Sequence, residues 1–544
     1  MQSESRTCLQ CAQDFIIDAD DFVFYEKMRV VAPTICPMCR LQRRLAWRNE
    51  INFYKRVCGL CKKQIISMYH ESVPFPVYCS PCWWSDAWAA EDFGRDYDLS
   101  RDFFERLGDL QKIVPHEALQ SKGSINSDYA NYTMNSKNVY LSTVAAESED
   151  CAYCRFVIKN TDCVDCEYTT SCQSSVGLSR GAYNTDCSYC FVSENCRDVH
   201  YSADCHNCES CFGCINLRHK KYHIFNTEYS KEEYEKKVKE LRALPHAELL
   251  ERVDEFMKTQ PHRANVHFQC QNVTGDDIYF SVSCKQCFGA NFVRNGAYLF
   301  DVSSLSRSNE TVQDLYDCAI VADVQLGYEM IGGSKSYDCK FGIINDNCVG
   351  TTYSMFCYGC TEVLGCIGLR SKSYCILNKQ YSKEEYALLK EQILSSQPGE
   401  FFPNTLCPFA YNESMAMEYF SLSEAEAKRL GYSWRPREKR NYTLDAETFG
   451  CAHNESCKHE CTGAFRLIPL EKKLYERLNL PNPTLCPNCR RGERLDKRNP
   501  LKLWLRTCMN NPPAGGCAKA IEATYPPTDP TIIFCNDCHA KVLA

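Results

Sequence analysis

The sequence has little that marks secretion, a membrane or the common kinds of catalysis. Its first residues, MQSESRTCLQC, contain no basic segment followed by an apolar core, so we expect no secretory signal. No apolar run reaches the length of a membrane-spanning helix. The chain also has no nucleophile elbow, phosphate-binding loop or dinucleotide fingerprint. These absences favour a cytoplasmic protein and weigh against the enzyme classes that such motifs mark.

Cysteine, in contrast, is abundant, with 40 among the 544 residues. In a small secreted protein this content would indicate a disulfide framework. Because we expect a reducing compartment, reduced thiols and thiolate-bound metal are the better interpretation. The length predicts about three or four domains.

One stretch occurs twice, near each end of the chain. CPMCRLQRRLAWRNEINFYKRVC, which runs from Cys36 to Cys58, aligns without a gap with CPNCRRGERLDKRNPLKLWLRTC, from Cys486 to Cys508. Both copies have a paired-cysteine knuckle followed by an arginine-rich stretch that ends at Asn. We therefore expect related modules over residues 1–95 and 449–544.

The cysteine spacing of each module predicts two zinc sites. The first module reads C-x2-C-x24-C-x2-C and then C-x2-C-x17-C-x2-C, and the second module keeps the long loops of 24 and 17 residues. Two knuckles brought together supply four thiolates in a tetrahedron, which is the geometry that zinc prefers. We predict about four zinc ions per chain, and Cys451, His453 and His459 are alternatives to Cys457 in the third site. The predicted ligands are Cys8, Cys11, Cys36, Cys39, Cys58, Cys61, Cys79, Cys82, Cys457, Cys461, Cys486, Cys489, Cys508, Cys517, Cys535 and Cys538.

These motifs resemble known proteins. The CLQC knuckle, Phe15, Tyr25 and the CPMCR knuckle are similar to a zinc-ribbon or treble-clef domain that is widespread in bacteria. The whole layout, with FPVYCSPCWW, CPFAYNESMAMEYF and RNPLKLW, resembles an uncharacterised cysteine-rich family of small-genome bacteria. Some members of that family carry a CaiB/BaiF acyl-CoA transferase name, but the residues of this chain give no support for that chemistry.

The middle of the chain predicts two cysteine-rich parallel β-solenoids. Cysteines recur every nine residues, as in Cys187, Cys196, Cys205 and Cys214, and residues 166–234 align with 318–386 at a constant offset. A fixed short period is typical of a solenoid. Two nonapeptides would make a coil of about 18 residues, which would stack Cys187 on Cys205. Small residues at every third place would suit a three-sided coil instead.

Helical segments separate these parts. We predict a helical linker at 96–124, the first solenoid at 125–229 and a helical cap and linker at 230–265. The second solenoid follows at 266–381, with a cap and tether at 382–448. Ser230 with Glu233, Ser382 with Glu385, and Ser423 with Glu426 each form a capping-box pattern. The linker helix should pack the first module on the segment that follows, and the tether should dock the last module.

The solenoid cysteines have three possible roles. They can be small residues of a narrow core, ligands of a metal or cluster, or disulfide partners between coils. The first role is favoured because larger side chains would not fit a narrow core. The run DCHNCESCFGC encourages metal binding, but Cys163, Cys190 and Cys211 have no counterpart in the second repeat.

The arginine-rich stretches suggest a partner surface. Arginine contacts to phosphate with an aromatic side chain for base stacking would bind RNA or DNA. The candidate residues are Arg40, Arg43, Arg44, Trp47 and Arg48 in the first module and Arg490, Arg491, Arg494 and Arg498 in the last.

Charge weakens the nucleic-acid hypothesis. Residues 1–82 have 11 Lys and Arg against 8 Asp and Glu, and residues 449–544 have 14 against 9. Each zinc site with four thiolates contributes a net charge of −2, so two sites per module remove most of the positive surplus. The arginines can therefore simply neutralise the thiolates.

We therefore predict a non-catalytic, zinc-dependent binding protein that acts as a protein-interaction scaffold, with nucleic-acid binding as the alternative. A polysaccharide-cleaving β-helix enzyme is a third possibility, for which Asp276 and Asp277 are the paired carboxylates. Adjacent strand residues point to opposite faces, so this pair is poorly placed to act on one bond. We predict no membrane and no small-molecule substrate.

Overall fold

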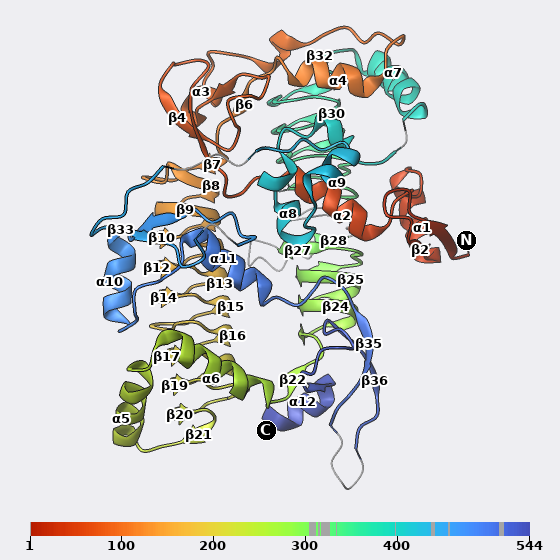
Figure 1. Cartoon of the computed structure of the whole chain (residues 1–544). Coiled ribbons are helices and arrows are strands. Elements are labelled where there is room, and N and C mark those ends of the chain that lie inside the picture. The colour runs from red at the N-terminus through yellow and green to blue at the C-terminus, as the bar shows by residue number, and fades with distance from the viewer. Residues whose placement is uncertain are drawn as a thin grey trace. The chain divides into compact units, whose positions relative to one another are not determined.

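The structure is a computed structural model of the chain (Figure 1). It describes residues 2–543 except 304–311, 314–315, 317–326, 333–334, 398, 437–440, 455–456 and 511–515, so the part of the second repeat around Cys318 lies outside the described residues. The chain divides into two compact units. Unit 1 comprises Met1–Ala118 with Asn265–Pro436, and unit 2 comprises Leu119–Ala264 with Arg437–Ala544. Each unit therefore joins one terminal module to one solenoid, and the first module belongs with the second solenoid.

Each unit contains a parallel β-solenoid, which confirms the predicted fold class. In unit 2 the register of β10 (Glu149–Ala152), β12 (Thr161–Val164) and β14 (Gln173–Val176) pairs residues that are 12 apart. In unit 1 β29, β30 and β31 repeat the same 12-residue offset. The coil is therefore 12 residues long, and the 18-residue coil predicted from the sequence is wrong. Figure 1 shows these short strands stacked as successive rungs.

The remaining solenoid strands have the following bounds. The first solenoid contains β7 (Ser121–Lys122), β8 (Tyr129–Met134), β9 (Lys137–Ala146), β11 (Arg155–Ile158), β13 (Glu167–Thr170), β15 (Ser179–Ala182), β16 (Phe191–Glu194), β17 (Arg197–His200), β18 (Ala203–His206), β19 (Glu209–Phe212), β20 (Lys221–Ile224) and β21 (Thr227–Glu228). The second contains β23 (His267–Phe268), β24 (Gln271–Tyr279), β25 (Val282–Asn291), β26 (Val293–Arg294), β27 (Phe300–Ser303), β28 (Val312–Gln313), β29 (Val349–Thr352), β30 (Thr361–Leu364), β31 (Ser373–Ile376) and β32 (Lys379–Gln380).

A three-residue unit generates the coil. Every third residue from Asn135 to Phe225 has a positive φ, and the residue that follows each of these from Val139 to Cys214 is buried. The left-handed residue turns the chain, so four triplets close one 12-residue coil. Asn and Asp accept this conformation more readily than other residues with a side chain. The composition rich in Asn and Asp therefore follows from the backbone.

The nine-residue spacing of the cysteines has a hydrogen-bond origin. Cys187 lies in the column of Ser175 and Val199, which are 12 residues away on either side. Its thiol donates to the carbonyl of Cys196, with a distance of 3.6 Å from Sγ to the oxygen. The same bond from residue i to the carbonyl of residue i+9 recurs along both solenoids. Cysteines nine apart are thus neighbours across two coils, and Cys187 does not stack on Cys205.

Helices cover the ends of both solenoids. α5 (Lys231–Arg242) and α6 (His246–Lys258) follow the first solenoid, and Tyr234 of α5 packs on Phe212 and Ile224. α7 (Lys383–Ser395) follows the second, where Tyr386 packs on Ile376. The predicted capping boxes open both α5 and α7, and a third opens α9 (Glu424–Arg429).

Two helical segments, α4 (Phe103–Gln111) and the tether, pack on other parts of the chain than expected. α4 packs on the second solenoid, with the Phe103 ring 5.5 Å from that of Tyr353, and not on the segment that follows it. The tether, which includes η2 (Asn404–Leu406), η3 (Tyr411–Glu413) and α8 (Met415–Tyr419), belongs to unit 1. The amide of Met415 donates to the carbonyl of Arg48 (2.8 Å). The tether therefore docks the first module and not the last.

Candidate metal centres

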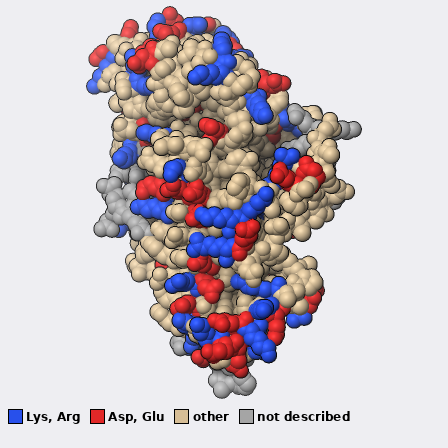
Figure 2. Space-filling model, turned by 90° about the vertical axis from the view of Figure 1, so that its left-hand side faces the viewer, with Lys and Arg blue, Asp and Glu red and all other residues tan. Residues whose placement is uncertain are grey.

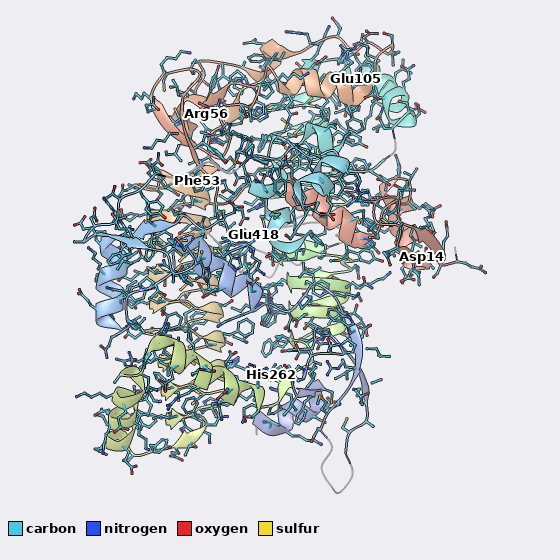
Figure 3. The ribbon with its side chains drawn as sticks, viewed as in Figure 1. Asp14, Phe53, Arg56, Glu105, His262 and Glu418 are labelled. Atoms are coloured by element: carbon cyan, nitrogen blue, oxygen red, sulfur yellow. The ribbon has the colours of Figure 1, made fainter. Side chains whose placement is uncertain are left out.

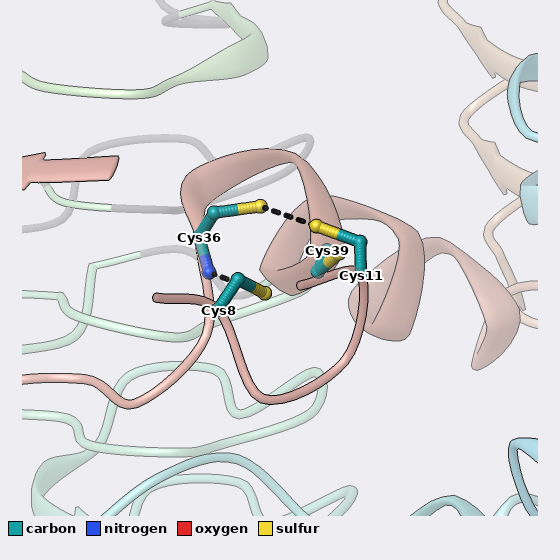
Figure 4. Close-up of side chains that lie close together, drawn as sticks. All are labelled: Cys8, Cys11, Cys36 and Cys39. Atoms are coloured by element: carbon teal, nitrogen blue, oxygen red, sulfur yellow. Dashed lines mark hydrogen bonds between the residues drawn. The ribbon is translucent and has the colours of Figure 1, made fainter. Parts of the chain in front are cut away.

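The first cysteine cluster lies between a hairpin and a helix. Cys8 and Cys11 lie in the turn between β1 (Glu4–Thr7) and β2 (Asp14–Ile17), and Cys36 is the N-cap of α2 (Pro37–Ala46), where Pro37 starts the helix. α1 (Ala19–Met28) lies between them in the chain. Figure 4 shows the four sulfur atoms turned toward one another, with the amide of Cys36 donating to Sγ of Cys8 (3.2 Å). The hairpin and the helix N-terminus therefore fix the four thiols.

The second cluster repeats this plan. Cys58 and Cys61 lie between β3 (Tyr54–Val57) and β4 (Gln64–Ser67). Cys79 follows β5 (Val77–Tyr78) as the N-cap of α3 (Ser80–Trp83), and Cys82 lies within α3. Arg56 on β3, which is labelled in Figure 3, donates to the carbonyl of His70 (2.9 Å) and holds the returning loop. β5 pairs in parallel with β6 (His116–Glu117) after the short helix η1 (Ala90–Phe93). This cluster therefore sits where the chain leaves the module.

The third cluster contains the alternative Cys451 in the place predicted for Cys457. Its four cysteines are Cys451, Cys461, Cys486 and Cys489, while Cys457 lies in a second close group with His453 and Cys489. The amide of Cys486 donates to Sγ of Cys451 (3.3 Å), as the amide of Cys36 does to Cys8. The knuckle carries an insertion between Cys451 and Cys461, and the spacing alone could not show which cysteine began it.

The elements around the third cluster match those of the first. They are β33 (Thr448–Gly450), β34 (Ala464–Arg466), α10 (Pro469–Arg477) and α11 (Pro487–Asp496).

The fourth cluster groups the four predicted cysteines, Cys508, Cys517, Cys535 and Cys538. They lie among β35 (Trp504–Thr507), β36 (Ala520–Ala523), β37 (Ile533–Phe534) and α12 (Asn536–Leu543). β37 pairs in parallel with β22 (His262–Arg263), as β5 does with β6.

Sulfur distances in all four clusters fit a tetrahedral metal. Four sulfur atoms about 2.3 Å from a zinc ion lie about 3.8 Å from one another. The Sγ–Sγ distance is 3.8 Å for Cys11 and Cys36 and 3.8 Å for Cys61 and Cys79. It is 3.7 Å in the third cluster and 3.9 Å in the fourth. All four sulfur atoms of each cluster lie within 4.8 Å of one another, so each cluster could hold one metal ion.

One thiol in each of the first two clusters favours the thiolate form that binds metal, whereas the pKa of Cys39, which is bonded to Cys36, and of the partly buried Cys79 is raised. A bond from the Cys39 thiol lowers the pKa of Cys36 to about 5. Burial raises the pKa of Cys58, but backbone N–H groups of Cys79 and Cys61 outweigh it and lower the value to about 6. Thiolate is the metal ligand, so these donors prepare the sites for a cation.

The arginine-rich helix of the first module faces the interior of unit 1. Arg43 donates to Glu329 with Nη2–Oε1 at 2.7 Å and also contacts Glu400 at 3.3 Å. Arg44 lies 3.8 Å from Glu329, and the side chains of both are fully buried. α2 therefore carries its positive charge to buried carboxylates beside the solenoid.

The matching helix of the last module, α11, also directs its arginines to buried carboxylates within unit 2. Arg490 pairs with Asp165 (2.7 Å) and with Glu471 (2.8 Å), and Arg494 pairs with Asp165 at 3.1 Å. Arg498 pairs with Glu167 of β13. Burial raises the pKa of Glu167, but Arg498 and Arg494 outweigh it and lower the value to about 2. These carboxylates on the solenoid wall were missed because nothing in the sequence links them to α11.

The other candidate partner residues are also buried. Arg40 donates to the carbonyl of Ile35 (2.6 Å), Arg48 pairs with Glu50 at 2.5 Å, and the Trp47 ring packs on Phe402. Arg491 is buried as well. Burial in these places does not favour contact between the arginine helices and a partner, and that role stays a prediction.

The solenoid supplies no further metal group among the described residues. All 39 described cysteines are free thiols, and the groups of close ligands lie only in the terminal modules. The candidate carboxylates of an enzyme serve the fold: Asp276 accepts from the amide of Val266 (2.7 Å), and Asp277 accepts from the hydroxyl of Tyr279 (3.1 Å).

No helix in the described part of the chain has both the length and the apolar character needed to span a membrane. No protein-family model matches the chain, and no curated protein matches it either.

Proposed function

We propose that the protein is a non-catalytic, zinc-stabilised scaffold that binds a protein partner through its solenoids. Each zinc ion takes four thiolates from a hairpin knuckle and a helix N-terminus, as in a zinc-ribbon or treble-clef module. Such a site is closed, because no coordination position remains for water or substrate. The four ions therefore act as folding elements and not as catalysts.

The observation that carries this proposal is the burial of the arginine helices. Arg44 and Arg494, which occupy matching positions, reach buried carboxylates within their own units. A buried charge needs a partner and hydrogen bonds, so these pairs fix how each module packs on its solenoid. In this proposal each module holds its solenoid in place, and the exposed faces of the coils bind the protein partner.

Those faces suit a protein partner better than a polyanion. Lys137 pairs with Glu149 (2.5 Å), and Lys221 with Glu209 (3.0 Å), each across one coil. Figure 2 shows Lys and Arg side chains next to Asp and Glu side chains on the face it draws. A nucleic-acid site would need a continuous basic patch. Neighbouring charges of both signs suit the extended surfaces by which solenoids bind proteins.

The test combines crosslinking with charge reversal. Zinc-loaded full-length protein is crosslinked in lysate of the cells that make it, and partner peptides are mapped by mass spectrometry. We expect crosslinks on solenoid lysines such as Lys137, and loss of the partner when Lys137, Lys159 and Lys221 are each changed to Glu. A matched control changes Lys137→Glu together with Glu149→Lys and so retains the ion pair.

Two results would overturn the proposal. One is a partner that binds every solenoid variant as tightly as it binds the parent protein. The other is salt-dependent binding of mixed-sequence RNA or DNA by the zinc-loaded protein at low ionic strength, which would restore the nucleic-acid alternative.

A further inference from the structure

The third centre has more ligand groups than one tetrahedral ion uses. The insertion between Cys451 and Cys461 brings in His453 and Cys457, whose ligand atoms lie within 4.8 Å of each other and of Sγ of Cys489. Sγ of Cys457 is 3.4 Å from Sγ of Cys489. These three residues form a second group of close ligand atoms, which has only Cys489 in common with the four-cysteine group.

The chain makes room for this insertion on α11. A Cβ atom at Gly492 would lie only 2.2 Å from Cγ of His459. In the ungapped alignment the matching residue of the first module is Gln42, whose side chain bonds to Tyr411. Only Leu9 and Gln10 separate the two cysteines of that first knuckle. His459 of the insertion therefore lies against a helix that lacks a side chain at the point of closest approach.

We propose that the third centre holds two metal ions that share the Cys489 thiolate. The first ion is bound by Cys451, Cys461, Cys486 and Cys489. The second is bound by Cys489, Cys457 and His453. Pairs of zinc ions that share thiolates are the basis of Zn2Cys6 modules, and one nitrogen with two sulfur ligands is an established zinc donor set.

Charge balance favours the second ion. One Zn²⁺ with four thiolates has a net charge of −2, and a fifth thiolate at Cys457 would make it −3. A second dication brings five thiolates and two ions to −1. The second ion would therefore bring the Cys457 thiolate into the partly buried centre without adding net negative charge.

The second ion would differ from the others in its access. Among the described residues three protein ligands surround it, and the side chain of His453 is 29% exposed. One coordination position therefore remains for water or for a side chain of a bound protein. Glu493 lies 3.6 Å from Nε2 of His453 and can orient the imidazole, as carboxylates do beside ligand histidines.

The test is a zinc chloride titration of the full-length protein, followed by native mass spectrometry. We expect five zinc ions at saturation, and four in the Cys457→Ser and His453→Gln variants. His459→Gln is the matched control, because His459 pairs with Asp496 (3.0 Å) and lies outside the ligand group, and it should still take five. In cobalt-loaded protein the fifth ion should reduce the paramagnetic signal per ion, since a bridging thiolate couples the two spins.

The inference rests on the proposed zinc scaffold, and the two fail in different ways. A parent protein that stops at four ions overturns the shared site alone, whereas one that holds fewer than four overturns the scaffold. A Cys457→Ser variant that still takes five ions places the extra ion elsewhere and overturns the site. A Cys457→Ser variant that binds fewer than four zinc ions shows that Cys457 is a ligand of the first ion, and this result also overturns the shared site.

Discussion

At the scale of single residues, the inward positions of the coil decide which side chains the solenoid accepts. Cys187 lies between Ser175 and Val199 in one column, and its thiol donates to the carbonyl of Thr185 (3.3 Å). A serine hydroxyl can make the same bond. We expect Cys187→Ser to change the free energy of unfolding by less than about 1 kcal/mol, whereas Cys187→Leu should lower it by about 1–3 kcal/mol through overpacking. Urea denaturation of the zinc-loaded protein measures both, and equal effects would contradict a steric role.

Glu117 gives a pH-dependent prediction at the same scale. Burial raises its pKa from 4.5 to about 7, although Ser80 and Trp84 donate to the carboxylate at 2.6 and 3.0 Å. The folded protein thus prefers the neutral carboxyl, and its contribution to stability falls as the pH rises from 4.5 to 7.

Between pH 5.5 and 7.5 that loss is about 2 kcal/mol. The side chain of the Glu117→Gln variant stays neutral at every pH. As the pH rises from 5.5 to 7.5, the free energy of unfolding of the variant should therefore increase by this amount relative to that of the parent protein. Denaturation of both proteins in the same zinc buffers cancels the effect of pH on metal binding. A difference that does not change with pH would contradict the assigned pKa.

At the scale of elements, the arginine helices are the joints between module and solenoid. Arg494→Ala would leave Asp165 and Glu167 buried with part of their compensation gone, and we expect a loss of about 3–5 kcal/mol in the free energy of unfolding. Arg477→Ala is the matched control in the same unit. Its ion pair with Asp186 is partly exposed, with Arg477 at 45%, so the loss should be under about 1 kcal/mol. Similar losses in both variants would contradict the joint.

The elements also show what the sequence could predict. Cysteine spacing predicts fifteen of the sixteen close cysteines, and the capping boxes predict where α5 and α7 begin, because both depend on local geometry. The spacing could not separate Cys451 from Cys457, since an insertion leaves the order of donors open. The nine-residue period was misread as half of a coil, because it reflects a bond between successive coils. The signal for the triplet that was available in the sequence was Asn or Asp at many positions spaced by multiples of three, where the structure has a positive φ.

At the scale of the whole molecule, each solenoid belongs to one unit with the terminal module that is farther from it in the sequence. The sequence predicts the opposite pairing. Residues 1–118 join residues 265–436, and residues 119–264 join residues 437–544. Pairing of this kind depends on contacts such as Arg43 with Glu329, which are far apart in sequence and leave no periodic signal. If the four clusters hold zinc as proposed, each site should contribute roughly 10 kcal/mol or more to folding, and we expect both units to depend on the metal for their assembly.

The most direct test of the zinc scaffold is the zinc content of the purified full-length protein in zinc-free buffer. Elemental analysis gives zinc relative to sulfur, and the 40 Cys and 11 Met provide an internal count of protein. The account predicts four tightly held zinc ions per chain, with a fifth bound only when zinc is added. Fewer than four zinc ions, or iron in their place, would contradict it.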